Sequence, residues 1–324
     1  MNIIVQYTKL VEDALAQLSL DKQPAALYAP IKYTLDLGGK RIRPALLLLA
    51  NNLFDGEDKS ALNAALGIEV FHNFTLVHDD IMDDAPLRRG KTTVYKKWDT
   101  NVAILSGDVM LIQAIQLLVK EPHAKQSEIL DLFNTTAIEV CEGQQYDMNF
   151  ETSTTVSIDD YLKMIELKTA VLVAASLKIG AIIANASAEN AHHIYEFGKN
   201  LGIAFQLMDD ILDLYGNPEK VGKRVGGDVI ANKKTYLLLK AQELATGKLK
   251  KDLDFCLTST VLAPEQKVAK VTAIFNDLNI KKLANAEMDL FYNTAISHLD
   301  SIDAPNNKKQ VFEAFAKNLM NRES

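Results

Sequence analysis

The sequence is poor in residues that cross-link or interrupt a chain. Its 324 residues include only two cysteines, Cys141 and Cys256, and neither has the spacing of a metal-ligand pair. This pattern argues against a disulfide framework or a structural zinc site and fits a reducing compartment. Glycine (15) and proline (8) are also scarce, so signals for turns are few. We therefore expect a cytoplasmic protein of long helices joined by few connections.

A basic balance of charge and a long apolar run are also absent. The chain has 35 basic and 42 acidic residues, a formal net charge of −7, which argues against electrostatic binding of nucleic acid. The longest apolar run, residues 45–50, is far shorter than a membrane span, and the first twenty residues lack the pattern of a signal peptide. We expect neither a nucleic-acid partner nor an integral membrane segment.

Apolar residues recur with the helical period through most of the chain. The expected helices cover residues 3–19, 24–37, 42–53, 60–84, 102–120, 126–149, 158–184, 189–215, 233–246, 265–278, 281–299 and 308–321. Strand patterns are nearly absent, and the best candidate, 152–156, is expected to be a loop. Segments that are apolar nearly all round, such as 102–119, indicate helices inside a large bundle. We predict an all-α fold and a single domain over residues 1–324.

The first of two acidic clusters follows an apolar helical segment. Asp79 and Asp83 are four residues apart and share one helix face, and Asp80 and Asp84 repeat that spacing. Like charges at this spacing repel each other, and no Lys or Arg lies within one turn of Asp79 or Asp83. Carboxylates near an apolar core need a cation, and a donor set of oxygens alone favours Mg²⁺.

The second acidic cluster has the same spacing, with Asp209, Asp210 and Asp213 on another apolar helix. Either cluster alone is compatible with a solvated helix end, whereas two copies in apolar helices favour metal binding. Mg²⁺ prefers to share its ligands with substrate phosphates. Two facing clusters therefore predict a site for a diphosphate or a triphosphate.

Basic segments offer partners for such phosphate groups. The first combines glycines, which let a backbone approach a ligand closely, with cations that suit phosphate oxygens; it contains Gly38, Gly39, Lys40, Arg41 and Arg43. Arg88 and Arg89 follow the first acidic cluster by one short loop. The alternatives are a solvated basic turn and simple charge balance for Asp83 and Asp84.

Other polar residues lie close to the clusters in the sequence. His72 precedes Asp79 by seven residues and lies about 20° from it around a helix axis, so it is either a buried core histidine or a ligand. Gln206 lies three residues before Asp209. Four further candidates are weak when taken singly: Lys168, Thr169, Lys223 and Lys233.

In their order and spacing these motifs resemble the trans-isoprenyl diphosphate synthases, or polyprenyl synthetases. The resemblance covers roughly residues 25–240 through GGKRIRP (38–44), LVHDDIMD (76–83), LRRG (87–90), GQ (143–144), KTA (168–170), FQLMDDILD (205–213), GK (222–223) and KKTY (233–236). The resemblance implies a helical bundle around a central elongation cavity, usually as a homodimer. It also implies Mg²⁺-dependent, head-to-tail condensation of isopentenyl diphosphate with an allylic diphosphate.

The resemblance implies roles for individual residues. The direct metal ligands would be Asp79, Asp83 and Asp209, supported by Asp80, Asp210 and Asp213. Isopentenyl diphosphate would be bound by Lys40, Arg43, His72 and Arg89, and the allylic substrate by Arg88, Lys168, Thr169, Gln206, Lys223 and Lys233. Catalysis would depend on Asp79, Asp80, Asp83, Arg88, Lys168, Asp209 and Lys223.

The implied reaction explains these residue types. Breaking the allylic C–O bond places negative charge on the departing diphosphate, which Mg²⁺, Arg88 and the lysines would stabilise. The cavity must exclude water, which would otherwise quench the carbocation as an alcohol. Oxygen atoms of Thr169 and Gln206 are candidates for stabilising the carbocation. In this family the released diphosphate is the usual candidate for the base.

Product length in this family depends on bulky residues shortly before the first acidic motif. Phe74 lies five and Phe71 eight residues before Asp79, whereas Thr75, at four residues, is small. An aromatic residue at the fifth position before an uninserted motif resembles the geranylgeranyl-type enzymes. A helical wheel places Phe71 about 80° and Phe74 about 140° from Asp79, which favours Phe71 as the plug, and both are also compatible with ordinary core residues. We expect a C15–C20 product, with geranylgeranyl slightly favoured over farnesyl diphosphate.

Other interpretations are weaker. A class I terpene cyclase also carries one DDxxD helix, but the second DDxxD and the GGKR segment count against a cyclase and against a head-to-head, squalene-type synthase. A non-catalytic regulatory subunit would be expected to lack some of the aspartates or basic residues. The chain departs from the family at Leu237, where proline often follows KKTY, and it has only Arg322 as a candidate lid cation at its C-terminal end.

Overall fold

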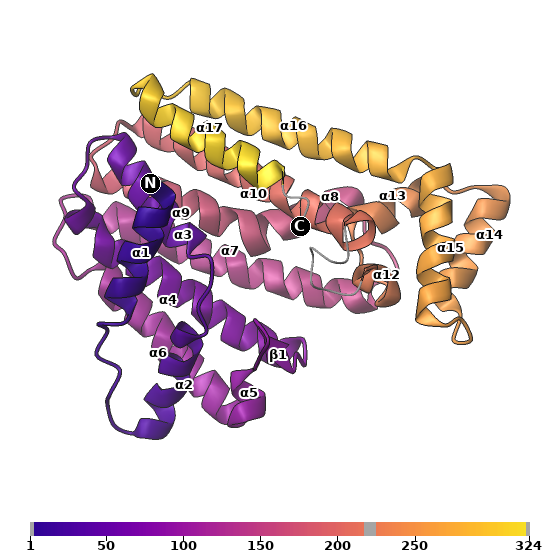
Figure 1. The fold of residues 1–324 in the computed structure, drawn as a ribbon, viewed down its shortest axis with the longest axis horizontal. Coiled ribbons are helices and arrows are strands. Elements are labelled where there is room, and N and C mark those ends of the chain that lie inside the picture. Colours follow the sequence, from indigo (N-terminus) through magenta and orange to yellow (C-terminus); the bar gives the residue numbers. More distant parts are fainter. Residues whose placement is uncertain (1–2, 217–224, 322–324) are drawn as a thin grey trace. The chain divides into compact units, whose positions relative to one another are not determined.

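The computed structural model describes residues 3–216 and 225–321. The described chain is almost entirely helical (Figure 1), which confirms the predicted all-α class. The Cα positions divide into two compact units, one formed by residues 1–135 and 175–195 and the other by residues 136–174 and 196–324. Three continuous helices contribute to both units: α7 (Gln126–Thr152), α9 (Val171–Ile183) and α10 (Ala188–Tyr215).

The first unit is built around α4. Helix α4 covers Asp58–Met82. The other elements are α1 (Ile3–Leu15), α2 (Ala25–Asp36), α3 (Ile42–Leu53), β1 (Leu87–Arg88), β2 (Lys91–Thr92), α5 (Val94–Lys97) and α6 (Thr100–Leu118). The apolar run 45–50 lies on α3 and is wholly buried, and α3 packs against both α1 and α4. Gly67 lets α4 approach α6 closely, because a Cβ atom at Gly67 would lie 2.9 Å from the Ala114 carbonyl oxygen.

Helix α6 is the one described helix that is long and apolar enough to cross a membrane by length and composition. Only 39% of its most apolar window is buried, although the helix packs against α2, α4 and α5. Its outward-facing side chains include Ile104, Leu105 and Ile112, which are exposed by 40%, 57% and 55%. Part of its apolar surface is therefore uncovered within this chain.

The second unit contains most of the remaining helices. They are α8 (Ile158–Ile165), the π-helical turn η1 (Glu166–Ala170), α12 (Gly227–Ile230), α13 (Tyr236–Leu244), α14 (Gly247–Thr258), α15 (Pro264–Asp277), α16 (Ile280–Asp300) and α17 (Asn306–Met320). A capping box begins α8: Ser157 Oγ accepts from the Asp160 N–H, and the Asp160 carboxylate accepts from the Ser157 N–H.

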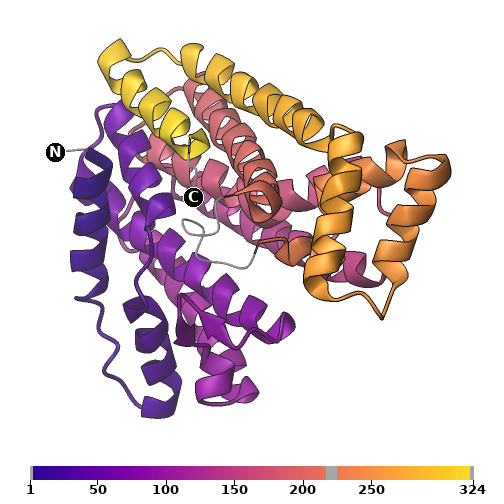
Figure 2. The same ribbon diagram turned by 45° about the vertical axis from the view of Figure 1, so that its right-hand side comes forward.

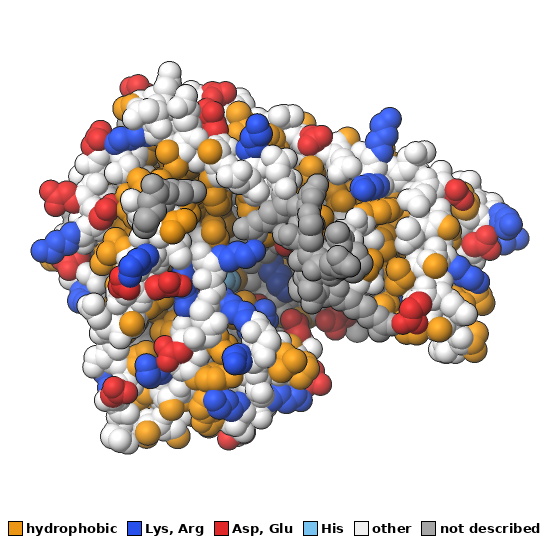
Figure 3. Space-filling model, viewed as in Figure 1, with side chains coloured by type: hydrophobic (Ala, Val, Ile, Leu, Met, Phe, Trp, Pro, Cys, Tyr) orange, Lys and Arg blue, Asp and Glu red, His pale blue; other side chains and the backbone are white. Residues whose placement is uncertain are grey.

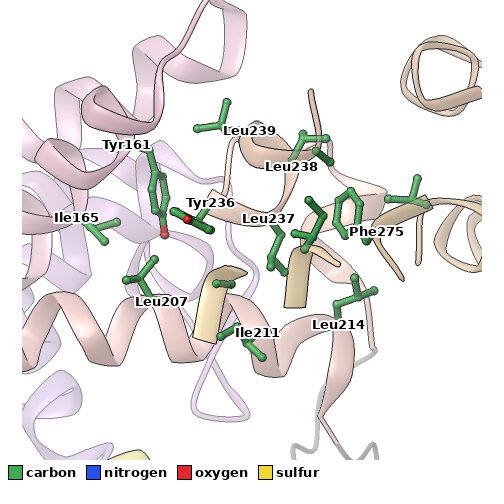
Figure 4. Close-up of a cluster of buried hydrophobic side chains, with 14 of the residues drawn as sticks. Tyr161, Ile165, Leu207, Ile211, Leu214, Tyr236, Leu237, Leu238, Leu239 and Phe275 are labelled. Atoms are coloured by element: carbon green, nitrogen blue, oxygen red, sulfur yellow. The ribbon is translucent and has the colours of Figure 1, made fainter. Parts of the chain in front are cut away.

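The core of the second unit joins α8, α10, α13 and α15. Figure 4 shows Leu207, Ile211 and Leu214 of α10 facing side chains of the neighbouring helices, including Tyr161 and Phe275. Figures 1 and 2 also show α16 and α17 running side by side in opposite directions after a short connection.

The long helices were predicted well, and short elements were missed. Sequence periodicity did not predict the two-residue strands β1 and β2 or the single turns α5 and α12. Helix α14 was missed because its lysines and Gly247 obscure a sparse apolar pattern that begins at Leu249. The predicted helix 158–184 is continuous but contains the π-helical turn, and the loop expected at 152–156 lies at 153–157, because Thr152 is the last residue of α7.

Candidate functional site

The first acidic cluster lies at the C-terminal end of α4. Asp79 and Asp80 belong to the last turn, and the Asp83 N–H donates to the Asp79 carbonyl oxygen at 2.8 Å. This last turn has no basic residue, and the C-terminal end of a helix carries partial negative charge. The carboxylates and the helix dipole therefore form an electronegative end that favours a bound cation.

Asp80 differs from its neighbours because it is buried against an arginine. Arg88 donates to Asp80 Oδ1 from Nε at 2.9 Å and from Nη2 at 2.6 Å, and the Asp80 side chain is only 6% exposed. Burial raises the pKa of Asp80 above its ordinary value, and Arg88 opposes that rise. Asp80 thus anchors Arg88 next to the acidic end of α4.

A tight hairpin positions Arg88 and Arg89. The turn residues Arg89 and Gly90 have φ values of 53° and 73°, the left-handed conformation that a two-residue type I′ turn requires. The hairpin is attached to α2 by Tyr33, whose hydroxyl donates to the Thr92 carbonyl oxygen at 2.8 Å. The Tyr33 ring also packs edge-on against Trp98, with the ring centroids 5.3 Å apart.

Arg89 reaches the glycine-rich loop before α3. Its Nη1 donates to the Gly38 carbonyl oxygen. Gly39 has a φ of 144°, and a Cβ atom there would lie 2.9 Å from Arg89 Cζ, so the guanidinium occupies space that a side chain would fill. Burial, with the positive charge of Arg41 nearby, lowers the pKa of Arg89. Lys40 is exposed on the same loop.

Besides Arg88 and Arg89, the first unit brings Arg43 into contact with His72. Arg43 Nη1 lies 3.3 Å from His72 Nε2. Burial first, and then the charge of Arg43, hold the pKa of His72 well below its ordinary value, so the ring is neutral. Because a guanidinium only donates, Nε2 accepts and the ring proton is on Nδ1. In Figure 3, Lys and Arg side chains gather over the region where α4 and β1 are labelled in Figure 1.

The predicted chain-length residues lie on α4 in the core of the first unit. Phe71 is fully buried and Phe74 is 8% exposed. Their ring centroids are 5.6 Å apart, and Phe71 also packs edge-on against Phe133 of α7 at 5.1 Å. Thr75 is half-buried, and its hydroxyl donates to the His72 carbonyl oxygen at 2.8 Å. Phe133, a third member of this aromatic group, was not predicted.

The second acidic cluster lies on α10, where Asp210 is held by two protein donors. The Tyr161 hydroxyl donates to Asp210 Oδ2 at 2.6 Å, and the Tyr236 N–H donates to the same oxygen at 3.3 Å. Burial raises the pKa of Asp210 to about 7, although the Tyr161 hydrogen bond lowers it. Asp209 is exposed on the same helix.

Asp213 organises the segment that leads to Lys233. Its Oδ2 accepts from the Asp228 N–H at 3.0 Å, which fixes the start of α12. The Lys233 N–H in turn donates to the Asp228 carbonyl oxygen at 2.9 Å. Asp210, Asp213, Asp228 and Lys233 line one small hollow of the second unit.

Lys168 and Thr169 lie on the π-helical turn η1, a feature that often marks functional sites. Lys168 Nζ contacts Asp147 Oδ2 at 2.5 Å, with the two side chains 24% and 19% exposed. Gly143 allows this approach, because a Cβ atom there would lie 2.2 Å from the Lys168 backbone nitrogen. The carboxamide of Gln144 is buried, and no hydrogen-bond partner for it is found in the described part of the chain. Gln206 is half-buried on α10.

The structure therefore groups the predicted residues by unit. The first unit brings together Lys40, Phe71, His72, Phe74, Thr75, Asp79, Asp80, Asp83, Arg88, Arg89 and Arg43, and the second contains Lys168, Thr169, Gln206, Asp209, Asp210, Asp213 and Lys233. Lys223 and Arg322 lie outside the described residues.

Arg41 corrects one expectation. The sequence grouped Arg41 with Lys40 and Arg43 as cations that suit phosphate oxygens, with a solvated basic turn as the alternative, but Arg41 is turned inward and pairs with buried Glu69. Glu69, Asp147 and Tyr161 were not predicted as neighbours of the site. Glu69 is the one residue with a usable signal, since a lone carboxylate in the apolar segment 64–71 requires a buried partner.

The carboxylates of the two acidic clusters suit a Mg²⁺ ion that is coordinated partly by the protein and partly by a substrate. In residues 3–216 and 225–321, no three His, Cys, Asp or Glu side chains are close enough to enclose a metal by themselves. Mg²⁺ is commonly held by one or two carboxylates together with water and substrate phosphates. Carboxylates at one helix end, with arginines close by, suit that mode better than a cage made of protein alone.

Comparison with known proteins identifies the family. A sequence profile described as polyprenyl synthetase matches residues 24–278. Over 235 residues the chain is 42% identical to a geranylgeranyl diphosphate synthase of Methanosarcina mazei, covering 72% of each protein. Over 258 residues it is 38% identical to a geranylfarnesyl diphosphate synthase of Natronomonas pharaonis, covering 74% of this chain and 76% of the relative.

A crystal structure of geranylgeranyl pyrophosphate synthetase from Pyrococcus horikoshii matches the fold with a TM-score of 0.92 and 32% identity. The match covers 98% of this chain and 97% of that one. The chain therefore belongs to the polyprenyl synthetase family.

Proposed function

We propose that this chain is a short-chain trans-prenyltransferase that adds isopentenyl diphosphate to an allylic diphosphate, with a C20 diphosphate as the main product. The observation that carries this proposal is the basic set of the first unit: Arg89 against Gly38, and Arg43 against the neutral ring of His72. These cations lie in the unit that also holds Asp79 and Asp83. The combination suits a diphosphate bound with a divalent cation.

The metal in this proposal is Mg²⁺, with Asp79 and Asp83 as direct ligands in the first unit and Asp209 as a direct ligand in the second. Asp80, Asp210 and Asp213 would act in support; each accepts a hydrogen bond within its own unit, from Arg88, Tyr161 and Asp228 respectively. When bound, the metal supplies positive charge that neutralises the departing diphosphate.

The chain's own residues would share the remaining work between the two substrates. Isopentenyl diphosphate would be held by Lys40, Arg43, His72 and Arg89; the allylic diphosphate would be held by Arg88, Lys168, Lys223 and Lys233. Neutral His72 would donate from Nδ1 and carry no charge of its own. Oxygen atoms of Thr169 and Gln206 would face the positive carbon.

The reaction needs no base from the protein, because the released diphosphate can accept the proton. The allylic C–O bond breaks and its electron pair leaves with the diphosphate. The isopentenyl double bond attacks the allylic carbon and forms a C–C bond. A proton is then lost from the new carbocation to the released diphosphate, and the double bond is restored.

Product length in this proposal is limited by the aromatic group Phe71, Phe74 and Phe133. Phe74→Ala is expected to lengthen the main product by at least one C5 unit, because it removes the less deeply buried ring of the Phe71–Phe74 pair. Phe197→Leu, which alters a buried aromatic pair with Phe312 in the second unit, is the control and should leave product length unchanged. An unaltered product from folded Phe74→Ala would contradict this assignment.

The activity is tested by incubating the protein with Mg²⁺, isopentenyl diphosphate and, separately, dimethylallyl, geranyl or farnesyl diphosphate. Products are dephosphorylated and sized by chromatography with mass detection. Geranylgeraniol as the end product is the expected result. A cyclic hydrocarbon formed without isopentenyl diphosphate would indicate a cyclase, and no turnover with any starter would indicate a regulatory subunit.

We also propose that the protein acts as a homodimer in the cytoplasm. The support for the dimer is the apolar face of α6, where Ile104, Leu105 and Ile112 are exposed. Exposed apolar patches commonly mark protein interfaces. Light scattering coupled to size-exclusion chromatography is expected to give twice the mass of the chain, and Ile112→Lys is expected to shift the protein toward the monomer.

A further inference from the structure

A buried ion pair lies beneath the glycine-rich loop of the first unit. Arg41 Nη1 contacts Glu69 Oε1 at 2.6 Å, and the two side chains are 3% and 2% exposed. Arg41 Nη2 donates to the Leu35 carbonyl oxygen at 2.6 Å. Both terminal nitrogens of this guanidinium are therefore occupied by the protein, and Arg41 does not serve as a phosphate ligand in this conformation.

The carboxylate of Glu69 is held from a second direction. Asn73, one turn further along α4, donates from Nδ2 to Glu69 Oε1 at 2.9 Å and to the Glu69 carbonyl oxygen at 2.8 Å. His72 is the residue next to Asn73. The network thus spans the turn of α4 that presents His72.

The network joins three elements through one side chain. Arg41 is the residue before α3 and has a left-handed φ of 45°. Its guanidinium contacts the carbonyl of Leu35 in α2 and the carboxylate of Glu69 in α4. The chain between Leu35 and Arg41 carries Gly38 and Lys40, so both ends of this loop are fixed by the same guanidinium.

Positions of the substrate-facing cations follow from this arrangement. The Gly38 carbonyl oxygen accepts from Arg89, and Gly39 leaves the space that the Arg89 guanidinium occupies. Two residues after Arg41, Arg43 contacts His72 Nε2 at 3.3 Å. A shift of Arg41 would therefore move both basic contacts of the first unit.

The cost of burial argues for a positioning role. A buried ion pair is weak evidence for stability, because two charges lose their hydration and an apolar pair of similar volume is often equally stable. The best-attested use of buried polar groups is to fix one register or one conformation among alternatives. Here the buried pair fixes both ends of the loop that carries Gly38 and Lys40.

We propose that Arg41, Glu69 and Asn73 are positioning residues for the isopentenyl diphosphate site. They act through Lys40, Arg43, His72 and Arg89 and do not touch the substrate themselves. The inference rests on the proposed function and deepens it, since a buried network would determine where the side chains that bind isopentenyl diphosphate lie.

The main test is Glu69→Gln, which keeps the shape of the side chain and removes its charge. The KM for isopentenyl diphosphate is expected to rise at least tenfold, with the KM for the allylic diphosphate and kcat within threefold of the wild type. A change confined to one KM indicates lost binding of one substrate. A partial loss of folded protein would lower the apparent kcat and leave both KM values unchanged.

A double variant guards against misfolding. Glu69→Gln leaves Arg41 charged and buried, whereas Arg41→Met combined with Glu69→Met removes both charges at similar volume. The double variant is expected to melt within a few degrees of the wild type and to show the same selective rise in KM. Glu196→Gln is the matched control: Glu196 pairs with Lys199 at 2.8 Å, and its carbonyl oxygen accepts from Asn200 at 2.8 Å. Both KM values of this control should stay within twofold.

Each outcome decides the proposal. A selective rise in the KM for isopentenyl diphosphate in both Glu69 variants would support it. An unchanged KM in both folded variants, or equal changes for the two substrates, would overturn it. Wild-type activity is measured first, because a wild type that forms no prenyl product with any starter would overturn the proposed function and the inference with it.

Discussion

Replacing Gly143 by alanine is the most direct test of how the second unit holds Lys168. An ideal Cβ atom at Gly143 would lie 2.2 Å from the backbone nitrogen of Lys168 and 2.6 Å from its Cα atom. Ordinary contacts of a Cβ atom begin at 3.4 Å, so the turn η1 and α7 must separate by about 1.2 Å, the difference between these distances. Backbone atoms cannot rotate away as a flexible side chain would.

The structure gives the size of the expected effect. Overpacking a tight contact costs about 1–3 kcal/mol, and alanine in a helix recovers about 1 kcal/mol relative to glycine, so the fold should survive. A displacement of about 1 Å in a catalytic group costs about 10²-fold in rate. Because the Lys168–Asp147 contact of 2.5 Å depends on this approach, we expect kcat of Gly143→Ala to fall about 10²-fold.

The assay compares this variant with Gly180→Ala. A Cβ atom at Gly180, in the first unit, would lie 2.1 Å from the Leu47 carbonyl oxygen. The steric clash is therefore of similar size, but it does not involve Lys168. Both variants are expected to lose a few degrees of melting temperature, and only Gly143→Ala should lose kcat at saturating substrates. The reasoning is refuted if folded Gly143→Ala keeps kcat within threefold of the wild type, or if Gly180→Ala is equally inactive.

Three further predictions concern groups next to the site. Tyr161→Phe removes the 2.6 Å hydrogen bond to Asp210 and should raise the Mg²⁺ concentration for half-maximal activity about tenfold, because partners of metal-binding groups contribute that much to affinity; an unchanged Mg²⁺ titration would contradict this. Burial holds the pKa of His72 below its ordinary value, so the unfolded chain binds the extra proton and stability falls on acidification below about pH 6.5. Urea titrations should show a loss of stability between pH 7 and 5.5 that His72→Gln lacks, and equal losses in the two proteins would refute it. Trp98→Leu removes the aromatic contact with Tyr33, worth about 1 kcal/mol, and so loosens the hairpin that carries both Arg88 and Arg89. The KM of both substrates should rise severalfold in steady-state assays, and a rise in only one KM would contradict this.

The fold was largely predictable because its helices are long and periodic. Helices such as α4 and α10 repeat their apolar positions over many turns, and their predicted ranges differ from the structure by a few residues at most. Short elements lack that signal. The hairpin at 87–92 has two residues in each strand, and it depends on Tyr33, Trp98 and the positive φ values of Arg89 and Gly90 rather than on any alternating pattern.

The candidate site was predictable wherever its chemistry lies within one helical turn. Asp79 and Asp83 share a face by spacing alone, and so do Asp209 and Asp213. Sequence spacing could not reveal which acidic residues are engaged by protein donors. Nothing in the motif indicates that Asp80 is bound by Arg88 or that Asp210 is bound by Tyr161.

Residues that hold the substrate-facing groups are separated from them by long stretches of chain. Arg41 and Glu69 are 28 residues apart, Lys168 and Asp147 are 21 apart, and Tyr161 and Asp210 are 49 apart. Such pairs have no fixed spacing, because loop length between two helices can change without altering how the helices pack. A motif therefore identifies the groups that chemistry requires at the substrate, whereas their supports are set by packing and become visible only in three dimensions. This difference explains why the basic motif groups Arg41 with Lys40 and Arg43, whereas its burial against Glu69 makes it a support for the residues on either side.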